Sequence, residues 1–270
     1  MRSLRAILLG VLLPAMLFTT ATGFVQAQQG KTLPRLLIIG DSTYEQHTRD
    51  LQKVLKGQVE VTYAFWNHDE IADTATTLQL LDRHLGRIDR NGQPVEQEKW
   101  PRWDVIHWNC GLADLVHRAP GVRAFRVMPI HAGGVCNTTA DQYAKNLDTL
   151  VTRLQAKAPS AKLIWASTTP IRASATQVFR LGSEVEYNAI AAQVMQRHGV
   201  AVNDMYDFVK HLINMDKPAG FGADPFNFDK KPIHMPIVRI LEQTLNLSPA
   251  EESEEEKISR EKRQQVEAGA

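Results

Sequence analysis

The chain of 270 residues is poor in cysteine, has almost no excess charge, and contains no long apolar run. Its two cysteines, Cys110 and Cys136, are too few for a small scaffold built on several disulfides. Whether they pair or remain thiols stays open, because the sequence does not give the distance between them. The 31 basic and 30 acidic side chains are scattered along the chain, so we expect no nucleic-acid partner.

The first apolar segment is too short to cross a bilayer. Ala6 to Phe18 spans 13 residues, whereas a membrane-spanning helix needs about 20. Arg2 and Arg5 precede this segment, and Val25-Gln26-Ala27 follows it with the small-x-small pattern of a cleavage site. Residues 1–27 are therefore predicted to be a signal peptide. We expect a secreted or periplasmic protein without a membrane span after cleavage.

Short apolar runs then alternate with amphipathic stretches. The runs expected to be strands are 36–39, 59–65, 103–108, 162–166 and 200–203, and the expected helices are 44–55, 71–85, 139–156, 183–197 and 236–245. This alternation predicts an α/β fold, a mainly five-stranded parallel sheet with helices on both faces. We expect one domain over residues 33–247. The charged tail, 248–270, has little to bury and is expected to be disordered or a solvated helix.

Two stretches lack periodicity and are expected to be loops. Residues 86–102 are polar, and residues 111–137 mix glycine, proline and histidine after the third strand. Long loops in a compact domain are often part of a functional site.

The first predicted strand ends abruptly at Gly40-Asp41-Ser42. Open α/β sheets bind their ligands at the carboxyl ends of the strands, and a predicted helix follows Ser42 directly. Ser42 is therefore a candidate nucleophile. The alternative is that Asp41 or Ser42 only caps the helix, and this tripeptide favours neither interpretation.

Two later segments carry side chains that a serine nucleophile needs. Asn109 follows the third strand, where its amide is a suitable donor to an oxyanion; alternatively, Asn109 and Asp114 organise a turn. His234 lies just before the last helix, with Asp224 and Asp229 upstream, as a base and its orienting acid require. A single loop histidine is more often merely exposed.

The order of these motifs resembles the SGNH, or GDSL-type, family of serine esterases. The resemblance covers about residues 34–245 and implies a three-layer α/β/α sandwich, similar to flavodoxin. It implies that Ser42 is the nucleophile, that the Ser42 N–H and the Asn109 side chain are oxyanion donors, and that His234 is the general base. The segments at Trp103 to Leu115 and Leu163 to Pro170 look like a secreted branch often linked to carbohydrate esters.

The chain departs from the family pattern at two positions. No glycine follows the second strand, so Asn67 or a neighbouring backbone amide is expected as the replacement oxyanion donor. Lys231 stands three residues before His234, where the family usually has its acid, and a lysine cannot accept the imidazole N–H. Asp229 is the preferred acid, Asp224 the second choice, and a Ser–His dyad oriented by a backbone carbonyl the third.

The remaining histidines do not indicate a metal site. None shows the i, i+4 helical spacing of a zinc motif, so we expect neither a metal nor a cofactor. His107 is expected to be a hydrogen-bonded core residue, and His131 could line the entrance to the substrate site.

The sequence thus predicts a serine hydrolase that cleaves carboxylic esters through an acyl-enzyme. The expected substrate is a small-molecule or carbohydrate ester, with deacetylation of a carbohydrate preferred. The alternatives are a lipase or thioesterase, an inactive binding module with the same fold, and a flavodoxin-like nucleotide-binding protein. The last is disfavoured because no further glycines follow Gly40 to hold a phosphate. The sequence leaves the oligomeric state open.

Overall fold

The computed structural model describes residues 32–67, 69–122, 126–172, 177–216, 228 and 231–269. At its centre is a parallel sheet with the strand order β2-β1-β3-β6-β7. The strands are β1 (Arg35–Ile39), β2 (Glu60–Tyr63), β3 (Val105–Trp108), β6 (Lys162–Ala166) and β7 (Ala201–Asn203). All five overlap the predicted strands, which confirms the α/β fold and its five-stranded parallel sheet.

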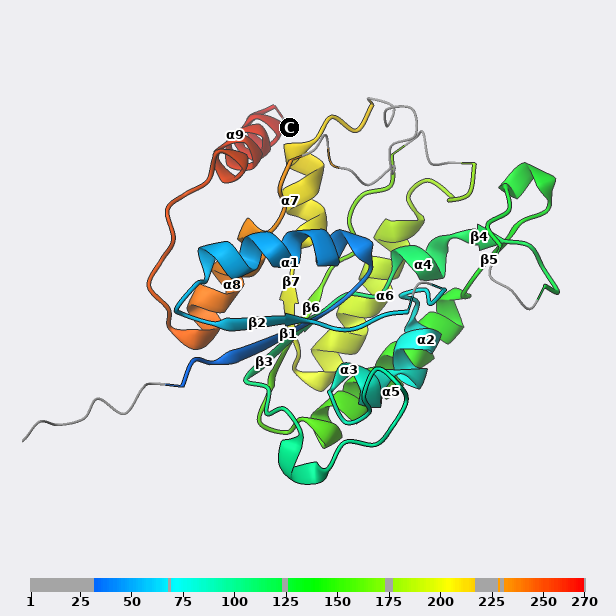
Figure 1. Ribbon diagram of the computed structural model, residues 1–270. Helices are drawn as coiled ribbons and strands as arrows, with labels where there is room; N and C mark the ends of the chain where they lie inside the picture. The colour runs from blue at the N-terminus through cyan, green and yellow to red at the C-terminus, as the bar shows by residue number, and fades with distance from the viewer. Residues whose placement is uncertain are drawn as a thin grey trace, which may run out of the picture. The chain divides into compact units, whose positions relative to one another are not determined.

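Helices cover both faces of this sheet (Figure 1). One face packs against α1 (Ser42–Val54), α7 (Met205–Leu212) and α8 (Met235–Leu245), and the other against α2 (Thr74–Gln79), α3 (Leu81–His84), α5 (Ala140–Lys157) and α6 (Ser183–His198). Along β1, Leu36 and Ile38 enter the first of these cores, while Leu37 and Ile39 enter the second. A strand buried on both faces has no polar side, which explains why these runs are continuously apolar.

The region expected to be a loop, 111–137, contains short regular elements. They are α4 (Leu112–Leu115), the antiparallel pair of β4 (His117–Arg118) and β5 (Val135–Cys136), and a 3₁₀ turn at Ile130–Ala132. A second 3₁₀ turn, Gln97–Lys99, lies within 86–102, and helix α7 was not predicted at all. Elements of two to four residues are too short to give a hydrophobic period, so the sequence could not reveal most of them.

Of the two expectations for the charged tail, disorder and a solvated helix, the structure shows a helix over most of its length. Residues Glu254–Ala268 form helix α9, which packs against α7, and Leu33–Ala270 is one compact unit. The domain therefore extends beyond residue 247. The docking of α9 depends on polar groups such as Ser259, which is buried and donates a hydrogen bond to the Phe208 carbonyl at 3.0 Å. Counting the apolar residues in the sequence cannot detect such contacts.

Three further expectations concern the signal peptide, membrane-spanning helices and the two cysteines. The predicted signal peptide lies outside the described residues. None of the described helices is long and apolar enough to span a membrane. Cys110 and Cys136 are both free thiols, with Cys110 buried.

Candidate active site

The turn between β1 and α1 places Ser42 at the carboxyl edge of the sheet. A Cβ atom added to Gly40 would lie 2.6 Å from the Tyr44 ring, so only glycine fits there. The Asp41 carboxylate accepts a hydrogen bond from the Thr43 N–H at 2.9 Å and caps the helix. Since Asp41 is the cap, the Ser42 hydroxyl is not needed for that purpose.

Tyr63, at the end of β2, fixes this turn from the neighbouring strand. Its hydroxyl lies 2.8 Å from the Gly40 carbonyl oxygen and 2.9 Å from that of Asp41. Burial raises the pKa of Tyr63, and the Asp41 and Glu45 charges add to this effect, so the phenol remains a donor. The sequence motifs did not indicate this residue. Its place on the strand that pairs with β1 is the signal that could have found it.

Ser42 keeps its hydrogen-bonding groups available. It is exposed, and neither its N–H nor its hydroxyl is hydrogen-bonded to another of the described residues. The first N–H groups of an α-helix have no partner within the helix and carry the positive end of its dipole. The Ser42 N–H is thus a donor that can stabilise a developing negative charge.

A cavity of about 760 Å³ opens beside Ser42, between α1 and the end of β2. Ser42 and Asn67 line it together, as expected of the nucleophile and a replacement donor. Other lining residues come from α1, from the chain after β2, from the loop that contains Arg90 and from α4: Glu45, Thr48, Arg49, Gln52, Phe65, Trp66, Glu70, Arg90 and Ala113. The wall is therefore a mixture of charged, polar and aromatic groups.

Asn67 already has an acceptor for its donors. Its backbone N–H lies 2.7 Å from one carboxylate oxygen of Glu70, and its Nδ2 lies 3.0 Å from the other. Burial raises the pKa of Glu70, but hydrogen bonds from Arg83 and Asn67 outweigh this and lower it. Asn67 must release Glu70 before its donors can serve a substrate.

Asn109 lies at the expected edge of the sheet but faces the protein interior. Its backbone N–H extends the β1–β3 pairing by a 2.9 Å bond to the Ile39 carbonyl. Its side-chain Nδ2 donates to the Ala166 carbonyl at 2.7 Å and makes a longer contact of 3.4 Å with Thr168 Oγ1. Asn109 is not among the residues that line the Ser42 cavity. In this structure its amide connects the ends of β3 and β6.

His234 is the N-cap residue of α8 and is largely buried, with 9% of its surface exposed. Burial lowers the pKa of the His234 imidazole, and the Asp50 carboxylate on α1 opposes this effect. Its Nδ1 atom is buried and has no hydrogen-bond partner among the described residues. A buried nitrogen of this kind needs an acceptor, which is the role expected of the orienting acid.

No hydrogen bond joins His234 to Ser42 among the described residues, and His234 does not line the cavity. His234 interacts instead with His47, whose pKa falls to about 4 through burial and then through the His234 charge. Because His47 follows Ser42 by five residues, about 7.5 Å of helix separates the level of this histidine pair from the nucleophile.

The two expected acids, Asp229 and Asp224, lie outside the described residues. Among the described carboxylates, Asp50 has the largest influence on His234, and the sequence analysis did not identify it. Asp50 lies one turn beyond His47 on α1, a helix that the sequence predicted without indicating which flank faces the base.

Of the two other histidines with a predicted role, His107 lies in the core and His131 on the surface. His107 is fully buried, its Nε2 lies 3.1 Å from Asn203 Nδ2, and burial lowers its pKa to about 3, so the core assignment is confirmed. His131 is exposed, on the 3₁₀ turn before β5, and does not line the cavity. The described residues contain no group of three or more potential metal ligands.

Comparison with known proteins identifies the fold. No model of a protein family matches the sequence, and no curated protein matches it either. Among solved structures, a lipase/acylhydrolase from Enterococcus faecalis is similar at 14% identity, covering 82% of this chain and 100% of its own, with a TM-score of 0.50. An acetyl xylan esterase is similar at 15% identity, covering 77% of this chain and 99% of its own, with a TM-score of 0.51. The chain thus shares the α/β fold of these two enzymes, in agreement with the fold that the resemblance implies.

Proposed function

We propose that the protein is a serine hydrolase that cleaves carboxylic esters, with acetylated carbohydrates as the preferred substrates. The observation that carries this proposal is the state of Ser42. Its hydroxyl is exposed in a cavity at the carboxyl edge of the sheet, and its own N–H is free among the described residues. Asp41 and Tyr63 hold this turn through hydrogen bonds that involve neither the Ser42 hydroxyl nor its N–H.

In the proposed reaction, Ser42 Oγ attacks the ester carbonyl carbon while His234 takes its proton. The oxyanion accepts a hydrogen bond from the Ser42 N–H, and the imidazolium then returns the proton to the departing alcohol. Water, activated by the same imidazole, hydrolyses the acyl-enzyme and releases the acid. Asp229 is our proposed acceptor for His234 Nδ1–H, and Asp224 the alternative.

Proton transfer requires the imidazole to come within hydrogen-bond reach of Ser42 in the substrate complex. Catalytic hydrogen bonds are often long in ligand-free enzymes and tighten when substrate binds. Asn109 and Asn67 are proposed as additional oxyanion donors. Each would first have to turn from its present acceptor, Ala166 or Glu70.

The cavity wall favours a polar substrate over a long acyl chain. Glu45, Arg49 and Arg90 supply charged groups near Ser42, while Phe65 and Trp66 offer aromatic surface. Hydroxyl-rich sugars use such polar partners, whereas a lipid needs an apolar channel. The acetyl xylan esterase of similar fold is consistent with this choice. We also propose that residues 1–27 direct export of the protein.

The test is hydrolysis of nitrophenyl acetate by wild type and by Ser42→Ala. We expect the substitution to lower kcat/KM by a factor of at least about 10³, because it removes the oxygen that forms the acyl-enzyme. Ser160→Ala is the matched control, since Ser160 is an exposed serine in the turn before β6, at the opposite edge of the sheet. Retained activity in a folded Ser42→Ala protein would overturn the assignment.

A catalytically silent binding module is the second candidate function. It is favoured by the lack of a Ser42–His234 hydrogen bond among the described residues and by the inward-facing Asn109 amide. A binding module would retain an acetylated sugar without releasing acetate. Calorimetry with acetylated xylo-oligosaccharides, followed by an acetate assay on the same sample, separates binding from turnover.

A further inference from the structure

We propose that the C-terminal helix α9 positions the base of this site, because Arg239 and Glu256 attach α9 to helix α8, which carries His234. This inference rests on the proposed function, in which His234 is the base. Helix α9 lies in the acidic and basic tail, to which the sequence motifs give no role.

Helix α8 holds His234 directly. The His234 carbonyl accepts hydrogen bonds from the Ile237 N–H at 3.0 Å and the Val238 N–H at 3.2 Å, so the residue is part of the first turn. Ile237 and Val238 are buried in the core that α8 shares with α1. Any movement of α8 relative to α1 therefore moves the imidazole relative to Ser42.

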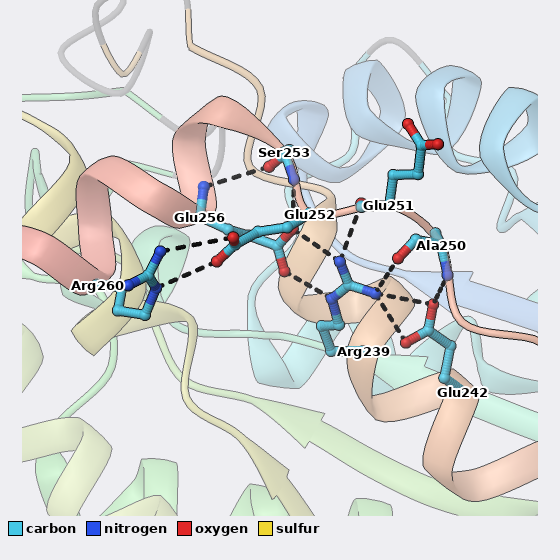
Figure 2. A network of polar contacts seen from close by, with 8 residues as sticks. All are labelled: Arg239, Glu242, Ala250, Glu251, Glu252, Ser253, Glu256 and Arg260. Carbon is cyan, nitrogen blue, oxygen red and sulfur yellow. Dashed lines mark hydrogen bonds and ion pairs between the residues drawn. The ribbon is translucent and has the colours of Figure 1, made fainter.

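Arg239, in the second turn of α8, uses all five of its N–H groups (Figure 2). Its Nε lies 2.7 Å from Glu256, its Nη1 contacts both Glu242 oxygens at 3.0 Å, and its Nη2 lies 3.0 Å from Glu256. Its remaining hydrogens bind the Ala250 carbonyl at 2.9 Å and the Glu251 carbonyl at 3.0 Å. One side chain thus fixes α8, the connecting segment and α9, and a lysine could not reproduce this fork.

Glu256 has two roles in one carboxylate. It completes the capping box of α9, where it accepts the Ser253 N–H at 2.9 Å while Ser253 Oγ accepts the Glu256 N–H at 3.2 Å. The same carboxylate pairs with Arg239. Burial raises the pKa of Glu256, but the hydrogen bonds from Arg239 and Ser253 outweigh it, so its pKa is lowered. The start of α9 and its attachment to α8 therefore form together.

The rest of α9 is anchored on α7. Besides the buried Ser259 hydrogen bond to the Phe208 carbonyl, Arg263 forms an ion pair with Asp207. Two attachments at different helices fix the orientation of α9 and hold its acidic first turn towards α8.

That acidic turn contributes to the charge around His234. The charges acting on the imidazole come from Asp50, Lys53 and His47 on α1 and from Glu255 and Glu256 on α9. Arg239, on α8, is paired with Glu256. Burial is the main influence and lowers the pKa of His234, while Asp50 and the two α9 glutamates oppose it. A merely structural tail would have no reason to affect the basicity of this imidazole.

The experiment is an NMR titration of the His234 imidazole in the full chain, with its signal assigned by its loss in His234→Gln. Glu255→Gln removes one α9 charge whose side chain makes no hydrogen bond or ion pair among the described residues. We expect it to lower the His234 pKa by roughly 0.3 unit, the size of one partly screened charge. The matched control is Glu254→Gln, because Glu254 is adjacent and equally charged but pairs with Lys257 at 3.8 Å and is not among the charges that shift His234.

Arg239→Gln tests the attachment itself. We expect kcat for nitrophenyl acetate to fall at least fivefold with KM unchanged, measured where the variant is fully folded. An unchanged His234 titration in Glu255→Gln, or a loss in Arg239→Gln confined to thermal stability, would overturn the proposal. Because the titration needs no turnover, it separates failure of this inference from failure of the esterase assignment, which would leave every variant inactive.

Discussion

The two flanks of helix α1 differ in how they hold the proposed catalytic residues. On one flank Ser42 is fixed by short-range structure: a glycine that must be small, an aspartate cap and the Tyr63 hydroxyl on the adjacent strand. On the other flank His234 is placed by helices α8 and α9 from the last part of the chain. The position of the nucleophile is thus a local property of the turn, whereas the position of the base depends on long-range packing.

After the loss of Ser42 itself, the largest effect should come from removing the base. His234→Gln is expected to lower kcat/KM for nitrophenyl acetate by about 10²- to 10⁴-fold, the usual contribution of a general base. His47→Gln is the paired control, because His47 lies beside His234 but has no assigned proton-transfer role, and it should lose less than about tenfold. A greater loss in His47→Gln than in His234→Gln would instead make His47 the base.

The next largest effect is expected from Tyr63→Phe, which tests how the turn holds Ser42. Tyr63→Phe removes the hydroxyl that binds the Gly40 and Asp41 carbonyls, at a cost of about 1–3 kcal/mol in unfolding free energy. Because the turn then loses its anchor, we expect kcat/KM to fall by about tenfold. Tyr206→Phe is the control, since its hydroxyl has no hydrogen bond among the described residues. Equal activity of the two variants would show that the turn does not need Tyr63.

Asn109→Ala should affect stability more than rate. The substitution leaves the buried Ala166 carbonyl without its side-chain donor, which costs about 1–3 kcal/mol in urea unfolding. Since the amide faces away from the cavity, we expect kcat of the folded protein to fall by less than about tenfold. A loss of kcat of about 10²- to 10³-fold without destabilisation would restore Asn109 as an oxyanion donor.

The smallest effect concerns pH. The pKa of His234 lies below its ordinary value of 6.5, mainly because the imidazole is buried. A base must be neutral to act, so kcat/KM should rise with pH through a pKa below 6.5 and then level off. Asp50→Asn removes the charge that most favours the imidazolium, and the acid limb should move to still lower pH. An acid limb centred above 6.5 is incompatible with this account.

The fold was largely predictable because buried parallel strands leave a plain signal. Leu36 to Ile39 could be identified as a strand from four consecutive apolar residues, and the structure places all four in the core. Helix α9 could not be identified as packed, since apart from Ile258 its contacts come from polar residues such as Glu256 and Ser259, which the sequence presents as solvated. Helix α7 has a buried face, but at eight residues it is too short for a clear period.

The candidate site was predictable only in its order along the chain. The motif at Gly40-Asp41-Ser42 and the β1–β3 pairing bring Ser42 and Asn109 to one sheet edge, as expected. Which way the Asn109 amide turns depends on the Ala166 carbonyl, 57 residues later, and no local pattern encodes it. The position of His234 likewise depends on the packing of α8 against α1.

The central claim is that Ser42 is an activated nucleophile, and a fluorophosphonate probe with peptide mapping tests it most directly. Such a probe phosphonylates a serine only where a base and an oxyanion site act on it, whatever the natural ester. We predict a single adduct on the peptide that contains Ser42, absent in Ser42→Ala and strongly reduced in His234→Gln. An unlabelled wild-type protein, or an adduct on a different serine, would contradict the assignment.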